Sequence, residues 1–158
     1  MRAIIDRQGI RGWTLIELLV VVAILGILSS LSIIKIQDMI EHARVAKAIG
    51  DLEAIQAELI GFEAGDDSLP TSLAGVDRDT YLDPWGHPYV YFRYPPAKGG
   101  GNVAGARMDR FLHPLNSDFD LYSMGKDGTS QKPITAKASQ DDIIRANDGA
   151  FIGLAAQF

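Results

Sequence analysis

The 158-residue chain contains no cysteine. This absence excludes a disulfide framework, a thiolate metal site, a cysteine nucleophile and a lipoprotein cysteine. Excess positive charge is also missing, since the net charge of −5 disfavours a strongly basic nucleic-acid-binding domain. Glycine and proline, at 16 and 7 residues, are too few for a low-complexity chain. The length therefore indicates about one folded domain with room for one added element.

An apolar run near the N-terminus is the strongest pattern that is present. Residues 18–34 carry no charge, and with residues 13–16 before them they are long enough to cross a bilayer core as a helix. Residues 1–12 contain three arginines against one aspartate, which predicts a cytoplasmic N-terminus and a C-terminal bulk across the membrane. A cleaved secretory signal fits poorly, because the apolar run continues past the small residues that would mark its cleavage site.

One carboxylate, Glu17, interrupts this apolar segment. A carboxylate at membrane depth is costly unless it is neutralised or paired, so Glu17 is a candidate functional residue. The alternative is that Glu17 lies at the headgroup boundary, where the cost is small.

The residues around Glu17, Gly12-Trp13-Thr14-Leu15-Ile16-Glu17-Leu18, resemble the N-terminal motif of type IV pilins and type II secretion pseudopilins. The resemblance implies that residues 1–12 are a leader, which a prepilin peptidase removes by cutting between Gly12 and Trp13. It also implies N-methylation of Trp13, which stands where the family usually has phenylalanine. Pairing of Glu17 with the new amine of a neighbouring subunit would relieve desolvation and set the axial register of a filament.

The helical pattern continues beyond the apolar run. Over residues 35–62, apolar side chains recur at spacings of three and four, with charged residues mostly on the other faces. No proline interrupts the pattern, and Gly61 and Gly65 predict its end. We expect one helix over residues 13–62, with a transmembrane and polymerisation half at 13–34 and an amphipathic half that packs on a globular domain.

Residues 63–158 predict a small sheet with long loops, which completes that globular domain. The segments 89–94 and 119–123 are typical of strands. Order resumes at 141–144, and the chain closes with an apolar tail at 151–154. The expected fold class is α+β, with the long helix packed on an antiparallel sheet in a pilin-like arrangement.

Two segments of this region, Leu82–Tyr89 and Asp118–Gly128, resemble the major pseudopilin of type II secretion. With the leader and the helix, the resemblance covers most of the chain. The chain departs from the family pattern in a short connection before Asp83, a long loop over 95–117 and a long tail after Asp142.

The resemblance implies a structural subunit of a homo-oligomeric filament, most simply the major pseudopilin of a type II secretion system. Its implied partners are the prepilin peptidase, an inner-membrane assembly platform and minor pseudopilins, with no nucleic acid. It implies a single-pass protein of the bacterial inner membrane, with its C-terminal domain in the periplasm, that assembles into a periplasmic or surface filament. A subunit of a type IV pilus or similar appendage is the alternative, and a monomeric membrane-anchored binding module is the second.

An enzyme is disfavoured by the placement of histidine. His42, His87 and His113 are scattered, and neither a GxSxG nor an HExxH motif is present. A membrane-anchored hydrolase therefore lacks a recognisable base and nucleophile.

The polar stretch 129–140 contains little apolar material to hold it in place and has aspartates at both ends. A calcium ion, which takes six to eight oxygen ligands, would bridge these ends and hold the stretch against the sheet. The alternative is that the aspartates start turns and face water. The family resemblance implies calcium, and by that likeness the predicted ligands are the carboxylates of Asp127, Asp141 and Asp142, the carbonyl of Leu121 and an oxygen of Ser123.

Overall fold

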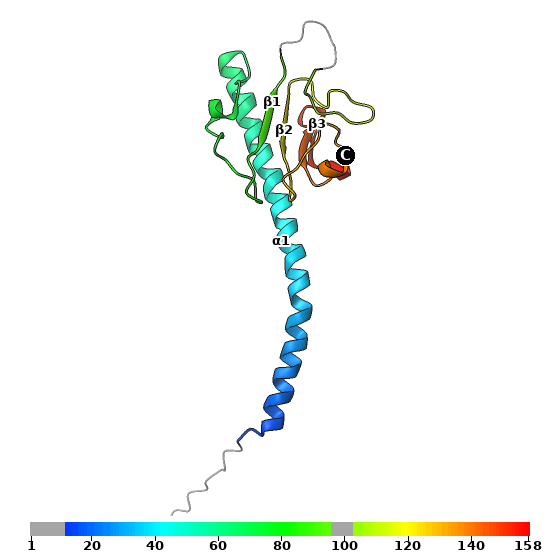
Figure 1. The fold of residues 1–158 in the computed structure, drawn as a ribbon. Helices are drawn as coiled ribbons and strands as arrows, with labels where there is room; N and C mark the ends of the chain where they lie inside the picture. Colours follow the sequence, from blue (N-terminus) through cyan, green and yellow to red (C-terminus); the bar gives the residue numbers. More distant parts are fainter. Residues whose placement is uncertain (1–11, 96–102) are drawn as a thin grey trace, which may run out of the picture. The chain divides into compact units, whose positions relative to one another are not determined.

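The computed structural model describes residues 12–95 and 103–158. The chain divides into two compact units, the first ending at Ile40 and the second, here called the globular unit, running from Glu41 to Phe158. The helix α1 spans Leu15–Asp66 and contributes to both (Figure 1). Residues 1–11 of the predicted leader and part of the predicted 95–117 loop lie outside the described residues.

Where its side chains are described, the first unit has its apolar residues exposed. Residues 13–30 are exposed throughout, including Trp13 at 72% and Leu15 at 83%. An 18-residue stretch of α1 has a mean hydropathy of 2.5, so by length and composition the helix can cross a membrane.

The helix ends later than the glycines predicted. It runs through Gly61 and Gly65 to Asp66. Glycine costs only about 1 kcal/mol in a helix interior, so it weakens a helix without stopping it. The chain turns away where Asp67 adopts a left-handed φ of 56°, a conformation that aspartate tolerates better than most residues.

Four short strands form one antiparallel sheet in the order β1-β2-β3-β4. They are β1 (Val90–Arg93), β2 (Phe119–Ser123), β3 (Ile143–Ala146) and β4 (Phe151–Leu154). The first two match the predicted segments closely, whereas the apolar tail forms the fourth strand. Single 3₁₀ turns complete the unit at Leu73–Val76, Lys137–Ser139, Asn147–Gly149 and Ala155–Gln157.

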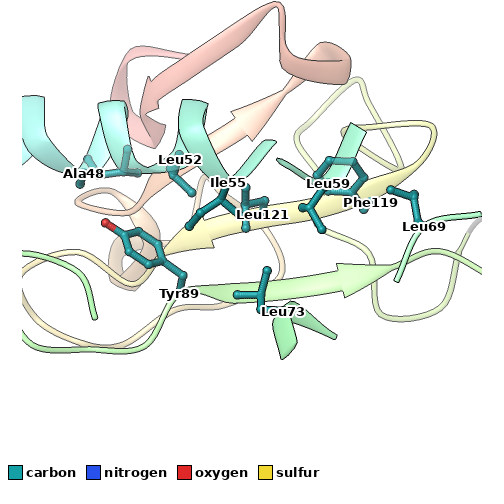
Figure 2. Close-up of a cluster of buried hydrophobic side chains, with 10 residues drawn as sticks. Ala48, Leu52, Ile55, Leu59, Leu69, Leu73, Tyr89, Phe119 and Leu121 are labelled. Atoms are coloured by element: carbon teal, nitrogen blue, oxygen red, sulfur yellow. The ribbon is translucent and has the colours of Figure 1, made fainter. Parts of the chain in front are cut away.

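One stripe of α1 packs on the sheet and forms the main core. The stripe consists of Ala48, Leu52, Ile55 and Leu59, all fully buried, at the spacing of a helix face. Figure 2 shows these side chains beside Leu121 and Phe119 of β2, with Tyr89 and Leu73 closing the cluster. From Ala48 onward, the amphipathic pattern predicted over residues 35–62 is the surface on which the helix meets the sheet. Its earlier apolar residues Ile36, Met39 and Ile40 are exposed, because they belong to the first unit and not to the globular unit that contains the sheet.

A second buried cluster gathers Leu115, Ile134, Ile144, Ala146 and Ala155. Because successive residues of a strand point to opposite faces, Ile143 belongs to the main core and Ile144 to this cluster. Ile134 is 2% exposed and comes from the polar stretch 129–140. That stretch therefore has an apolar anchor, which its composition did not lead us to expect.

Candidate functional site

The predicted processing site lies at the start of α1. Gly12 and Trp13 are exposed and precede the helix, which begins at Leu15. The bond between them therefore lies outside the helix. The structure thus leaves the predicted cleavage position accessible within the described residues.

Glu17 forms a capping box with Thr14 at this helix start. The Thr14 backbone N–H and hydroxyl donate to Glu17 Oε2 at 2.9 and 2.8 Å, and the Glu17 N–H donates to the Thr14 hydroxyl at 3.3 Å. The sequence interpretation overlooked Thr14, although the Thr-x-x-Glu spacing is a recognised signal of a helix start. Glu17 therefore has a polar partner within its own chain. The neighbouring side chains Ile16, Val20 and Val21 are apolar.

The two segments that resemble the major pseudopilin fold against each other through Asp83. Its Oδ1 accepts the backbone N–H groups of Trp85 and His87 at 3.0 and 2.8 Å, which closes a turn. Its Oδ2 accepts the hydroxyl of Ser123 at 2.6 Å. Asp83 is 5% exposed, so one buried carboxylate joins the turn to the end of β2.

The turn after β2 depends on close backbone approach. Gly125 has a left-handed φ of 64°, and a Cβ there would lie 2.2 Å from the carbonyl oxygen of Asp141. His87 Nδ1 donates to the Gly125 carbonyl at 3.1 Å. The resemblance-bearing segments therefore have structural roles in this fold.

The side chains of the four predicted calcium ligands Ser123, Asp127, Asp141 and Asp142 already form hydrogen bonds with other groups of the protein. Ser123 donates to Asp83, and Asp141 Oδ2 accepts the N–H of Asp127 at 3.0 Å. Asp127 Oδ1 accepts the N–H and hydroxyl of Thr129 at 2.8 and 2.9 Å. The fifth ligand, the Leu121 carbonyl, belongs to β2, which pairs with strands on both sides. Asp127 and Asp141 therefore lie close together, but both carboxylates already accept hydrogen bonds from protein groups.

Asp142 faces an arginine that sequence reasoning missed. Arg107 Nη2 donates to Asp142 Oδ2 at 2.5 Å, and both side chains are buried, at 4% and 0% exposure. Burial raises the pKa of Asp142, whereas the hydrogen bond from Ser130 and the charge of Arg107 oppose that rise. No local sequence pattern marks Arg107, because its partner is 35 residues away.

The donor set does not fit a calcium ion as predicted. Asp142 Oδ1 is buried without a hydrogen-bond partner, which leaves one oxygen open to a cation. Calcium needs six to eight such oxygens. Within residues 12–95 and 103–158, no group of three or more His, Asp or Glu side chains is placed to hold a metal ion.

Among the described residues, Ser123 and His87 do not form a nucleophile–base pair. The Ser123 hydroxyl donates to a carboxylate rather than to a histidine, and His87 donates to a backbone carbonyl. This arrangement does not activate a serine nucleophile, which needs a base within hydrogen-bond reach.

Comparison with known proteins agrees with these assignments. Residues 7–33 match the prokaryotic N-terminal methylation motif, which implies processing by a prepilin peptidase. No solved structure matches the chain significantly.

Several relatives align over most of the chain, and each is a type II secretion system core protein G. The Pseudomonas aeruginosa protein is 33% identical over 78% of this chain and 88% of its own length. The Klebsiella pneumoniae protein is 31% identical over 86% of this chain and 94% of its own. The Dickeya chrysanthemi protein is 30% identical over 88% of both. With its methylation motif and α+β fold, the chain belongs to the type II secretion core protein G family, the major pseudopilins, which are structural and not enzymatic proteins.

Proposed function

We propose that this chain is the main structural subunit of a periplasmic pseudopilus in a type II secretion system. The observation that carries the proposal is the register of the methylation motif with the apolar start of α1. A subunit of a type IV pilus or similar appendage is the second candidate, since it would share this helix. The relatives named core protein G favour the pseudopilus.

Before assembly, the subunit is a single-pass protein of the inner membrane. Residues 1–12 are a cytoplasmic leader, 13–34 cross the membrane, and 35–62 join 63–158 in a periplasmic domain. The exposed apolar side chains of residues 13–30 support this placement, because they need a lipid or helix environment. An inner-membrane platform and minor pseudopilins are the partners that would draw the subunit into a filament.

Prepilin peptidase cuts between Gly12 and Trp13, and the new amine of Trp13 is methylated. In the filament, Glu17 of one subunit pairs with the Trp13 amine of its neighbour. Pairing two opposite charges in apolar surroundings offsets the cost of removing each from water. Thr14 supports this role, because its two hydrogen bonds hold the Glu17 carboxylate at the helix start.

The experiment compares Glu17→Ala with Glu53→Ala, which removes an exposed carboxylate farther along the same helix. We expect the Glu17 variant to be processed and inserted in the membrane but to form far fewer filaments, with loss of secretion. The Glu53 variant should assemble normally. Mass spectrometry should find a mature N-terminus at methylated Trp13. Normal filament yield from Glu17→Ala, or an intact Met1 in assembled filaments, would contradict the proposal.

A deletion strain separates the two filament candidates. Deletion of the gene for this chain should abolish export of folded proteins while leaving surface pili intact. Loss of pili with normal export would instead identify a pilus subunit.

A calcium ion at Asp127, Asp141 and Asp142 is implied by the family resemblance alone, and the donor set of this chain does not match it. Its support in this chain is the open Oδ1 of Asp142, and its difficulty is the protein partners of the other oxygens. No part of the proposed filament role depends on it.

A further inference from the structure

The polar stretch 129–140 is held in place by a neighbouring loop. Met108 donates its N–H to the Lys132 carbonyl at 3.1 Å, and Ile134 donates back to the Met108 carbonyl at 3.0 Å. These bonds lay residues 132–134 beside the segment that follows Gly105. That segment belongs to the long 95–117 loop, one of the places where the chain departs from the family pattern.

Arg107 lies at the centre of this contact and is fixed at its backbone. Its N–H donates to Asp120 Oδ2 at 2.7 Å, which attaches it to β2, and its carbonyl accepts the N–H of Leu115 at 3.0 Å. The guanidinium carbon lies 4.0 Å from the centre of the Tyr122 ring. An arginine anchored at both ends in this way loses little further freedom when it forms its ion pair.

The guanidinium connects the two ends of the polar stretch. Nη1 donates to the Ser130 hydroxyl at 2.7 Å, near the first end, and Nη2 donates to Asp142, just past the second. The Ser130 hydroxyl also donates to Asp142 Oδ2 at 2.6 Å, which closes a triangle. The guanidinium thus joins the two ends of residues 129–140, which is what a calcium ion was expected to do.

We infer that Arg107 is the internal cation that fixes residues 129–140 on the sheet, in the place of a divalent ion. The globular unit is then stable without calcium. One positive charge of the chain itself meets the buried carboxylate of Asp142, and the backbone of Asp141 packs directly on Gly125. This inference does not rest on the proposed filament role, because it concerns only the folding of residues 41–158.

The test uses the full chain in detergent micelles and measures amide hydrogen exchange of residues 131–140. Gln131 and Ile134 are suitable reporters, because their N–H groups bond to Ser139 and Met108. Exchange in the unaltered chain should be the same in chelator and in calcium at about 5 mM, which exceeds the dissociation constants of weak extracellular sites. Slower exchange in calcium would overturn the inference and establish the divalent site.

Arg107→Met should speed exchange of these amides by roughly a hundredfold, because it leaves the buried carboxylate of Asp142 without its positive partner. Arg110→Met, an exposed arginine of the same loop, is the matched control and should exchange as the unaltered chain does. The double variant Arg107→Met with Asp142→Asn should exchange more slowly than Arg107→Met, since no charge remains unpaired. Equal exchange in Arg107→Met and Arg110→Met, or no recovery in the double variant, would overturn the role of the arginine charge.

Discussion

Arg107 and Arg145 each place a buried guanidinium over an aromatic ring, at 4.0 Å from Tyr122 and Phe119. Arg145 forms a two-point pair with Asp118, at 2.7 and 2.8 Å. Arg107 meets Asp142 through one nitrogen, which leaves Arg107 Nε and Asp142 Oδ1 buried without partners. The Arg107–Asp142 pair is thus less fully satisfied. Because Asp142 is fully buried whereas the Asp118 side chain is 31% exposed, removing the arginine leaves the costlier unpaired charge at Asp142.

A prediction at this scale concerns Tyr91, whose hydroxyl donates to the Pro70 carbonyl at 2.9 Å. Burial raises the pKa of Tyr91 from 10.0 to about 12. Between these values the unfolded chain loses the phenolic proton and the folded chain keeps it. The contribution of Tyr91 to stability is therefore full below pH 10 and falls as pH rises towards 12.

Tyr91→Phe should consequently lose stability less steeply than the unaltered protein over this pH range. Urea unfolding at several pH values between 8 and 12 measures both slopes. Parallel curves for the two proteins would show that the Tyr91 hydroxyl titrates alike in the folded and unfolded states.

Among the elements, α1 combines two different surfaces in one continuous helix. Residues 15–30 of α1 are exposed, whereas Leu52 and Ile55 are fully buried against the sheet. An isolated helix gains little from propensity alone, so the second part depends on this packing. The amphipathic stripe therefore serves the globular unit, and the apolar part remains free for lipid or other helices.

Ile55→Ala tests the stripe, and Ile60→Ala on the same helix is its control. Ile55 is fully buried, whereas Ile60 is 47% exposed. We expect Ile55→Ala to lower the free energy of unfolding by about 3 kcal/mol. Ile60→Ala should change it by less than about 1 kcal/mol. Chemical denaturation of both variants measures the difference, and equal losses would mean that the core is not where the structure places it.

For the whole molecule, the division into units predicts what can be separated. The globular unit from Glu41 to Phe158 contains the main core and the second cluster within its own residues. A chain of residues 35–158 lacks the apolar run and should be a soluble monomer. Sedimentation or light scattering of this fragment measures its mass, and the full chain in the same detergent-free buffer should aggregate. Aggregation of a well-expressed fragment at every concentration would show that the boundary is wrong.

Features that depend on neighbours along the chain can be predicted from the amino-acid order alone. The apolar run and the motif around Glu17 are each one contiguous segment. The helical stripe is a repeat of three and four residues. All of these can be recognised without the fold. Strands β1 and β2 were predictable from short aromatic, β-branched or alternating segments. The end of α1 was missed by four residues, because Asp67 and not a glycine turns the chain.

Which polar groups meet inside the globular unit depends on how the chain folds. Asp83 bonds to Ser123 across 40 residues and Arg107 to Asp142 across 35. The aspartates predicted to bind calcium instead accept hydrogen bonds from backbone N–H groups, hydroxyls and an arginine. A buried carboxylate needs a partner, but its own sequence context does not say which one, because the choice depends on what the folded chain brings within about 3 Å of it.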